Sequence, residues 1–345
     1  MKSRGLAVHG ANLPLVPFDF ERRELGAHDV AFDIAFAGIC HSDIHQAREE
    51  WGPALFPMVP GHEIVGHVSA TGSQVTKFSI GQRIGVGVFI DSCRTCEKCL
   101  AGLQQYCENG MTPTYNALDR EGNLVMGGYS NTFVVNENYA VNVPENLSLP
   151  GVAPLLCAGI TLYSPLKHWG ATSGSHVGVM GLGGLGHMGV KFAKALGATV
   201  TVFSHSPGKE ADALLMGADH FVSTADPKEL KNYESQFDLI LNTVSANLEM
   251  NLYVKLLKVD GTLVAIGLPS KPYSINVGTL LTARRSVAGS QIGGIPETQE
   301  MLDFCGKHNI VSDVEVISAD YANTAYDRTV ASDVKYRFVI DGKTF

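Results

Sequence analysis

The sequence predicts an α/β protein of two domains, one built on a doubly wound parallel sheet and the other on an irregular antiparallel β-barrel. At 345 residues, the chain is long enough for two domains. Between residues 156 and 290, apolar strand-like runs alternate with helical segments, which is typical of a doubly wound sheet of about six strands. Residues 1–155 instead contain short strands separated by turn signals such as "TGS" and "SIGQ", which favours antiparallel pairing.

A glycine-rich turn opens the parallel sheet. The run "HVGVM" is typical of a buried strand. It is followed by the spacing G-x-G-x-x-G, a helical stretch ended by Gly197, and the second strand "TVTVF". In this context the glycines let the backbone approach a dinucleotide pyrophosphate at the helix N-terminus, whereas a turn used for packing alone is the alternative. The predicted loop consists of Gly181, Leu182, Gly183, Gly184, Leu185 and Gly186.

The alternation of helices and strands continues toward residue 290. We expect a helix around "KEADALLM", closed by Gly217, and strands at "DHFVS" and "FDLILNTV". A helix over "NLEMNLYVKLLK" should stop at Asp260-Gly261, before the strands "TLVAIG" and "SVAGS". The helix "PETQEMLDFCGK", with Cys305 in the core, and the strand "YRFVID" should then return to the first domain. The predicted domains are therefore 156–290, which binds the dinucleotide, and 1–155, completed by 291–345.

Composition excludes several classes of protein. The net charge is −8 and no run of Lys or Arg is present, which argues against a nucleic-acid or anionic membrane surface. The N-terminus lacks the apolar stretch of a signal peptide, and no segment approaches the ~20 apolar residues of a membrane span. We therefore expect a soluble cytoplasmic protein. In that compartment clustered cysteines more often bind metal or do chemistry than form disulfides.

Four of the seven cysteines lie within fifteen residues. Cys93, Cys96, Cys99 and Cys107 have the spacing C-x2-C-x2-C-x7-C, and four thiolates form the closed tetrahedral shell of a structural zinc. An iron–sulfur cluster is the alternative, because C-x2-C-x2-C opens a ferredoxin run. That run continues x3-C-Pro, whereas here Cys107 lies eight positions after Cys99 and is followed by Glu108. The sequence therefore predicts a structural zinc site that does no catalysis.

Two other cysteines and a histidine are candidates for a second metal site. Cys40 lies in "GICHSDIH", His62 in "VPGHEIVGH" and Cys157 in "PLLCAGIT". Two thiolates, one imidazole and a water would make an open catalytic zinc shell, but spacing alone does not bring such distant residues together. Taken singly, each has an alternative as an ordinary core or surface residue. His62 and His67 are five apart, so the zinc-protease spacing H-E-x-x-H is excluded.

These motifs together carry a resemblance. In its "GICHSDIH", "VPGHEIVGHV", "LLCAGITLYSPL", "GLGGLGHMGVK" and "KYRFVIDG" segments and its four-cysteine segment, the chain resembles the zinc-dependent medium-chain dehydrogenases from end to end. Within them it resembles the cinnamyl-alcohol-dehydrogenase-like NADP(H) aldehyde reductases, on the wording "LLCAGIT" and "GGYS". The resemblance implies a GroES-like antiparallel barrel as the catalytic domain and a Rossmann domain for the cofactor. In the polyol branch a glutamate usually replaces the cysteine of Cys157.

The resemblance implies two zinc ions per chain and assigns the ligands of the catalytic one. These are Cys40, His62 and Cys157, with Glu63 as a nearby carboxylate that can approach the metal.

The same resemblance implies a proton relay close to this metal. Ser42 would hydrogen-bond the substrate oxygen, His45 would form the outer end of the relay, and Asp43 would support the site. Surface or ion-pair duty is the alternative for Asp43 and His45.

The cofactor and the substrate have implied contacts as well. Thr161 falls where the family contacts the nicotinamide, and Arg337 where it reaches the cofactor pyrophosphate, with ion-pair duty as the alternative for Arg337. Trp51, Phe89 and Ile292 fall in segments that line the substrate pocket, so an apolar or aromatic primary alcohol or aldehyde is expected rather than a polyol.

The end of the second strand predicts NADP(H) rather than NAD(H). NAD-specific sheets usually place an acid there, about 20 residues past the glycines, to hold the ribose hydroxyl. Here the strand ends in Ser204, His205 and Ser206, with Lys209 close behind and no acid before Glu210. Hydroxyls and a cation suit a 2′-phosphate. The alternative is that Ser206 caps a helix that has Pro207 at its first position.

The sequence therefore predicts an NADP(H)-dependent zinc alcohol dehydrogenase or aldehyde reductase, as a homodimer or a tetramer. A formaldehyde- or polyol-type zinc dehydrogenase using NAD is the alternative. Cys40 and Cys157 argue against a zinc-free quinone or enone reductase on the same fold. The acidic charge and the dinucleotide turn argue against a zinc-ribbon nucleic-acid binder.

Overall fold

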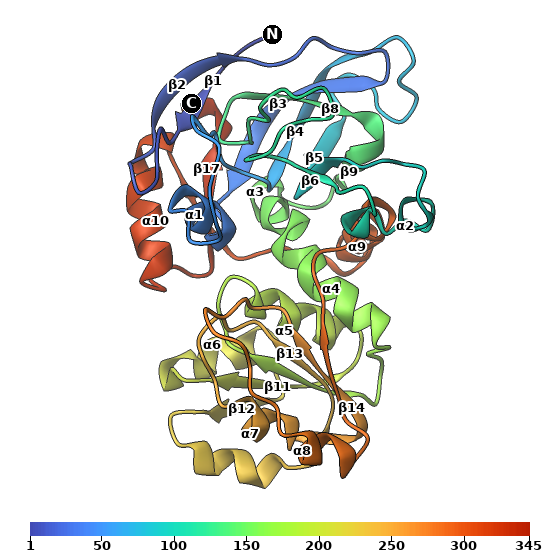
Figure 1. Cartoon of the computed structure of the whole chain (residues 1–345), viewed down its shortest axis with the longest axis vertical. Helices are drawn as coiled ribbons and strands as arrows, with labels where there is room; N and C mark the ends of the chain where they lie inside the picture. Colours follow the sequence, from blue (N-terminus) through green and yellow to red (C-terminus); the bar gives the residue numbers. More distant parts are fainter. The chain divides into compact units, whose positions relative to one another are not determined.

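The computed structural model describes residues 1–345, and the chain divides into two compact units. The first unit consists of Met1–Ile160 and Gly293–Phe345, and the second of Thr161–Ile292 (Figure 1). The fold class is the one predicted, with a parallel sheet in the second unit and a largely antiparallel sheet in the first. The domain boundaries were predicted after residues 155 and 290, and the two units of the structure meet in the sequence after Ile160 and after Ile292.

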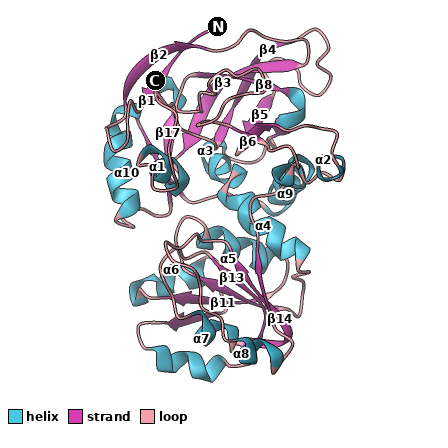
Figure 2. Ribbon diagram, viewed as in Figure 1, coloured by secondary structure: helices cyan, strands magenta, loops and turns pink.

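The second unit is built on a six-stranded parallel sheet in the order β12-β11-β10-β13-β14-β15. Its strands β11, β13 and β14 are labelled in Figure 2. The chain starts in the middle, at β10, moves outward through β11 and β12, and then returns to the other side of β10. That reversal makes the sheet doubly wound. The strands are β10 (His176–Met180), β11 (Thr199–Ser204), β12 (His220–Ser223), β13 (Phe237–Asn242), β14 (Leu257–Ala265) and β15 (Ser286–Gly289). The helices are α5 (Gly186–Ala195), α6 (Glu210–Leu215), α7 (Met250–Val254) and α8 (Val277–Leu281).

One predicted helix boundary in this unit is wrong. The helix expected to run up to Asp260-Gly261 ends at Val254, and β14 begins at Leu257 and passes through both residues. The pairing of β13 with β14 shifts register between Phe237 and Leu239, and Asp260 adopts a positive φ of 65° there. The Asp-Gly pair therefore forms an irregularity inside a strand, where an extra stretch of chain is accommodated, and does not stop a helix.

The first unit contains a seven-stranded sheet in the order β16-β17-β3-β4-β5-β9, with β8 also paired to β3. Its pairs are antiparallel except β16 with β17, which is parallel and was not predicted. The strands of this unit are β1 (Lys2–Ala7), β2 (Val16–Glu21), β3 (Asp29–Gly38), β4 (Ile64–Thr71), β5 (Arg83–Val86), β6 (Phe89–Asp91), β7 (Thr112–Pro113), β8 (Thr132–Asn136), β9 (Val141–Asn142), β16 (Val314–Ile317) and β17 (Arg337–Asp341). The helices are α1 (His41–Ala47), α2 (Glu97–Leu100), α3 (Leu149–Val152), α9 (Ile295–His308) and α10 (Ala322–Val330), and α4 (Ala158–His168) begins in this unit.

The C-terminal segment completes the first unit, as predicted. β17 pairs antiparallel with β3, bringing Val339 opposite Gly38. Cys305 in α9 is fully buried and its thiol lies 3.6 Å from the sulfur of Met301, so it is a core residue. The last strand therefore lies beside the strand that leads into the "GICHSDIH" motif.

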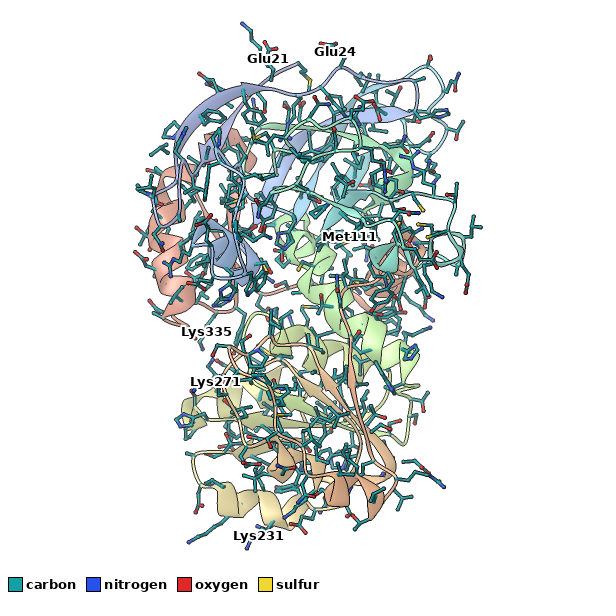
Figure 3. All side chains as sticks on the ribbon, in the orientation of Figure 1. Glu21, Glu24, Met111, Lys231, Lys271 and Lys335 are labelled. Carbon is teal, nitrogen blue, oxygen red and sulfur yellow. The ribbon has the colours of Figure 1, made fainter.

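The surface carries charges of both signs. Glu24, Lys231 and Lys271 are exposed and distant from one another in sequence (Figure 3).

No helix by itself has the length and apolar composition needed to cross a membrane. The segments Leu149–Leu156 and Ala158–His168 reach that length and composition only when taken together, and they are bent by 58° to each other.

Candidate active site and metal centres

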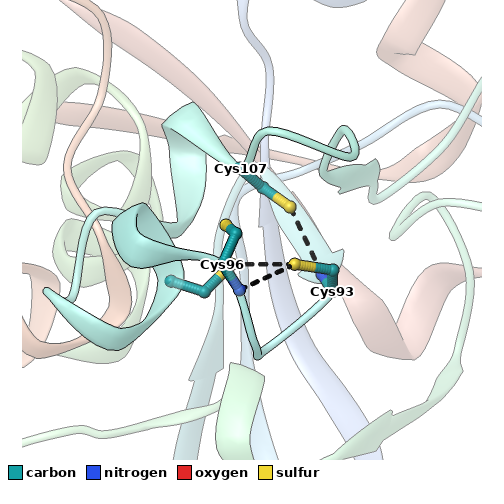
Figure 4. Close-up of side chains that lie close together, drawn as sticks. Cys93, Cys96 and Cys107 are labelled. Carbon is teal, nitrogen blue, oxygen red and sulfur yellow. Dashed lines mark hydrogen bonds between the residues drawn. The ribbon is translucent and has the colours of Figure 1, made fainter.

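The four cysteines of the predicted structural site converge. The ligand atoms of Cys93, Cys96, Cys99 and Cys107 all lie within 4.8 Å of one another. Three of the side chains can be followed in Figure 4, where backbone N–H groups point at sulfur. The Cys96 amide donates to Cys93 Sγ at 3.3 Å, and the Cys93 amide donates to Cys107 Sγ at 3.3 Å. All seven cysteines of the chain are free thiols, so no disulfide competes with a metal.

The surroundings of these thiols suit a bound metal. Hydrogen bonds from the Asn109 side chain and the backbone of Thr95 and Cys96 lower the pKa of the Cys93 thiol to about 5. Burial raises the pKa of Cys99 to about 11, and a hydroxyl lies 3.1 Å from its sulfur. Because zinc binds thiolates, the donor set fits a closed four-thiolate site.

The hydroxyl beside Cys99 belongs to Ser92, which anchors the segment. It also lies 2.7 Å from the Tyr139 hydroxyl, and the Tyr139 ring packs edge-on against Phe89, with centroids 6.0 Å apart. Phe89 is therefore buried beneath the four-cysteine segment. Its predicted place in a substrate pocket stays a prediction.

A second cluster brings together residues that sequence spacing could not connect. The ligand atoms of Cys40, His62, Glu63 and Cys157 all lie within 4.8 Å of one another, within the first unit. β3 pairs antiparallel with β4, with Ala37 opposite Ile64, so the residues that follow β3 lie beside those that precede β4. This pairing puts Cys40 next to His62.

Asp43 sets the orientation of His62. It is fully buried, and its Oδ1 lies 3.1 Å from His62 Nδ1 and accepts the Gly61 amide at 3.1 Å. Since Nδ1–H donates to the carboxylate, the lone pair of His62 Nε2 is available to a metal. That nitrogen is buried and has no hydrogen-bond partner in the protein. An orphaned buried nitrogen beside two thiols is what a zinc ligand set requires before the metal is added.

The electrostatics of this cluster also favour a cation. Cys157 and His62 hold the pKa of Cys40 well below its usual range, against the effect of burial. Burial lowers the pKa of His62, but Asp43 and Cys40 outweigh it and raise that pKa well above its ordinary value. A cluster that retains a proton so strongly also stabilises a metal ion that replaces the proton.

Glu63 forms an ion pair with Arg337, for which ion-pair duty was the alternative, although the sequence did not identify the partner. Arg337 Nη2 lies 2.6 and 2.7 Å from the two carboxylate oxygens of Glu63, and the same guanidinium donates to the Ile39 carbonyl. Burial raises the pKa of Glu63 to about 7, with the charge of Arg337 opposing the rise. The two residues are 274 positions apart, so only the pairing of β17 with β3 brings them together. The predicted contact of Arg337 with the cofactor pyrophosphate stays a prediction.

The relay residues lie along one side of α1. Ser42 Oγ is 3.5 Å from Cys40 Sγ, so the hydroxyl is at the cluster. His45, three residues later, hydrogen-bonds through Nδ1 to Glu50, and its side chain is 27 % exposed. Trp51 stacks on the His45 ring at 4.7 Å and is half exposed. The helix therefore carries one proton-exchanging group at the metal ligands and another at the solvent. No sequence pattern pointed to Glu50 as a partner of His45.

The glycine-rich turn in the second unit has the predicted form. It follows β10, and α5 begins at Gly186. Gly181 has a φ of 86°, and a Cβ on Gly186 would collide with the Gly181 carbonyl oxygen. A Cβ on Gly183 would meet nothing within 4 Å, so that side of the turn is open to a close-lying ligand.

The end of β11 lies against this turn. Lys209 Nζ donates to the Leu182 carbonyl at 2.8 Å, and burial lowers the pKa of the lysine. The Ser206 amide donates to Ser204 Oγ at 3.2 Å, while His205 is exposed. The Ser206 side chain makes no capping hydrogen bond to the short helix that follows, so capping does not account for this serine. Thr161 and Ile292 are the first and last residues of this unit, and both are buried. The contact of Thr161 with the nicotinamide and that of Ile292 with the substrate stay predictions.

Comparison with known proteins identifies the family of the chain. The family model described as "Alcohol dehydrogenase GroES-like domain" matches residues 26–145, and "Zinc-binding dehydrogenase" matches residues 184–307. NADP-dependent alcohol dehydrogenase C 1 of Mycolicibacterium smegmatis is 56% identical over 336 residues, covering 97% of this chain and 96% of that protein.

Two solved structures are similar over nearly the whole chain. A cinnamyl alcohol dehydrogenase from Sorghum bicolor has a TM-score of 0.96 at 46% identity, covering 99% of this chain and 98% of that one. The CAD of Helicobacter pylori complexed with NADP(H) has a TM-score of 0.93 at 44% identity, covering 99% of both chains.

Proposed function

Because the chain belongs to the zinc-binding alcohol dehydrogenases with a GroES-like domain, we propose that it interconverts primary alcohols and aldehydes with NADP(H) at a catalytic zinc. The observation that carries the proposal is the convergence of Cys40, His62 and Cys157 around the orphaned Nε2 of His62. Three such ligands leave a fourth position for substrate, whereas the four-cysteine site leaves none. The relative from Mycolicibacterium smegmatis is named an NADP-dependent alcohol dehydrogenase.

The protein's own residues have separate tasks in this reaction. When bound, zinc acts as a Lewis acid on the substrate oxygen and the nicotinamide carries the hydride. Cys40, His62 and Cys157 hold the metal, and Asp43 keeps the His62 ring in the orientation that this requires. Glu63, paired with Arg337, adds a carboxylate beside the three residues that would hold the metal.

Proton transfer is the task of α1. The Ser42 hydroxyl, at the metal ligands, donates a hydrogen bond to the substrate oxygen and passes it a proton when an aldehyde is reduced. His45, held by Glu50 and in contact with solvent, replenishes that proton. No direct hydrogen bond joins the two side chains, so at least one further group connects them.

The cofactor is NADP(H) in this proposal. Ser204, Ser206 and Lys209 supply hydroxyls and a cation next to the glycine-rich turn, and no acidic side chain precedes Glu210 there. A 2′-phosphate would gain charge-assisted hydrogen bonds from these groups. The Helicobacter pylori relative was solved with NADP(H).

The substrate is an apolar or aromatic primary alcohol or aldehyde. The Sorghum bicolor relative is a cinnamyl alcohol dehydrogenase, which supports a substrate of this kind. The test is a panel of aldehydes and polyols with NADPH or NADH, followed by cofactor absorbance. Turnover of cinnamaldehyde-type substrates with NADPH supports the proposal. Turnover confined to polyols or formaldehyde with NADH would overturn it.

The assembly is a homodimer, with a tetramer as a larger form. β15 is an edge strand with one free side, and α8 exposes Val277 and Leu281, with 62% and 76% of their surface accessible. Exposed edges of this kind are sites of pairing between copies. Light scattering on the purified protein measures the mass. The location is cytoplasmic, which suits a protein with seven free thiols.

A further inference from the structure

Three buried tyrosines surround Asp43, the residue that orients His62. Tyr115, Tyr129 and Tyr326 are 2%, 0% and 7% exposed and come from three distant segments of the first unit. Tyr129 ends a Gly-Gly-Tyr loop whose backbone is bonded to the Val59–Gly61 segment, with the Tyr129 amide donating to the Pro60 carbonyl at 2.9 Å. Tyr326 is carried by α10, which packs on α1.

Only one of the three hydroxyls donates to a protein group. Tyr129 Oη lies 3.0 Å from Asp43 Oδ2 and donates to it. The hydroxyls of Tyr115 and Tyr326 are buried and have no hydrogen-bond partner. Burial and the negative charge of Asp43 raise the pKa of both, so the two phenols remain protonated beside the carboxylate.

The carboxylate of Asp43 is fully used by its donors. Oδ1 accepts the Gly61 amide and His62 Nδ1, and Oδ2 accepts the Cys40 amide at 2.9 Å and the Tyr129 hydroxyl. Two donors on each oxygen occupy its lone-pair positions. Besides His62, the Tyr129 hydroxyl is therefore a side-chain donor that holds this buried charge in place. A carboxylate that lost this bond would keep three of its four donors and would hold His62 less firmly.

We propose that Tyr129 is a positioning residue for the catalytic metal, acting through Asp43 on His62. The inference rests on the proposed zinc site of Cys40, His62 and Cys157. The hydroxyl holds Asp43, Asp43 holds His62 Nδ1, and Nε2 is thereby directed at the metal position. Outer-shell partners of this kind typically change metal affinity or activity by about 10–100-fold when removed.

The neighbouring tyrosines provide a matched control. Tyr326→Phe deletes an identical buried hydroxyl near the same carboxylate, but one that makes no hydrogen bond to Asp43. Tyr115 is less suitable, because its ring stacks on the His62 ring with centroids 5.7 Å apart. If the hydrogen bond to Asp43 is what matters, Tyr129→Phe and Tyr326→Phe must differ.

The experiment compares zinc release from the purified full chain into an excess of chelator. Tyr129→Phe should release one of its two zinc ions about tenfold faster than wild type, and kcat should fall about tenfold while KM for NADPH stays unchanged. The second zinc ion should leave at the wild-type rate. Tyr326→Phe should match wild type in all of these readouts.

A double variant tests whether the effect of Tyr129 on the metal site acts through Asp43. Asp43→Asn should speed zinc release by itself, and adding Tyr129→Phe should speed it no further. Wild-type release from Tyr129→Phe, equal acceleration in Tyr326→Phe, or additive effects in the double variant would each overturn the inference. Wild-type protein holding a single zinc ion and lacking NADPH turnover would overturn the proposed function as well.

Discussion

The two metal clusters of the first unit are built in opposite ways. Cys93, Cys96, Cys99 and Cys107 come from one segment of fifteen residues, and backbone amides within that segment point at their sulfurs. Cys40, His62 and Cys157 come from three segments that only the pairing of β3 with β4 and the start of α4 bring together. The first cluster is formed within one short segment, as expected of a structural site, whereas the proposed catalytic site depends on the fold to bring its ligands together.

The largest effect is expected from Cys99→Ser. Cys99 is buried in α2, and binding free energy at a structural metal site is folding free energy. We expect the variant to lose solubility or to melt far below the wild type. Thermal unfolding and zinc content measure this. A variant that folded normally and kept both metals would remove the structural role from this cluster.

Cys40→Ser should separate activity from folding. Its backbone amide still donates to Asp43, so the local structure remains, while the metal loses one of three ligands. We expect an unchanged melting temperature, loss of one zinc ion, and turnover lower by at least about 10³-fold, since a Lewis acid contributes several kcal/mol. Unfolding of this variant would contradict the expectation that only the four-cysteine cluster is required for folding.

Ser42→Ala should lower turnover at neutral pH by roughly 10²–10⁴-fold, the usual contribution of general acid–base catalysis. His45→Ala should cost less, because His45 is partly exposed and solvent can replace it. Steady-state kinetics with both metals verified provide the measurement. Near-normal turnover of Ser42→Ala would exclude this hydroxyl from proton transfer.

The smallest effect is expected in the second unit, at Lys209. Lys209→Ala should lower kcat/KM for NADP(H) by about tenfold, or roughly 1.4 kcal/mol, and leave NAD(H) nearly unchanged. Lys191→Ala, a change at another lysine of the same unit, serves as the comparison. Equal losses with both cofactors would show that Lys209 supports the turn through Leu182 and does not read the phosphate.

The features that could be predicted from the sequence are those formed within a short segment, and those missed are formed by residues far apart in the chain. The glycine-rich turn, the six strands and the four-cysteine segment are encoded within short windows, and the structure contains all of them. The Glu63–Arg337 pair and the tyrosines around Asp43 depend on pairings between distant strands and loops, so no window contains their signal. Cys40, His62 and Cys157 were candidates from their residue types, but only the resemblance to a family joined them into one proposed catalytic set.

The one wrong boundary has a physical cause of the same kind. Asp260-Gly261 is a common helix stop, but here the neighbouring strand β13 recruits Leu257 into the sheet before that pair is reached. Tertiary pairing thus overrides a local turn signal, and the pair forms an irregularity in β14.

Removing the two zinc ions one after the other tests most directly whether the two clusters have different roles. The purified protein is incubated with a chelator while zinc content, NADPH-dependent turnover and far-ultraviolet circular dichroism are followed together. We expect one zinc ion to leave first, with turnover falling in proportion and the circular dichroism unchanged. The second should leave only as the secondary structure is lost. Release of both ions in a single step together with the fold, or turnover that survives loss of the first ion, would contradict the account.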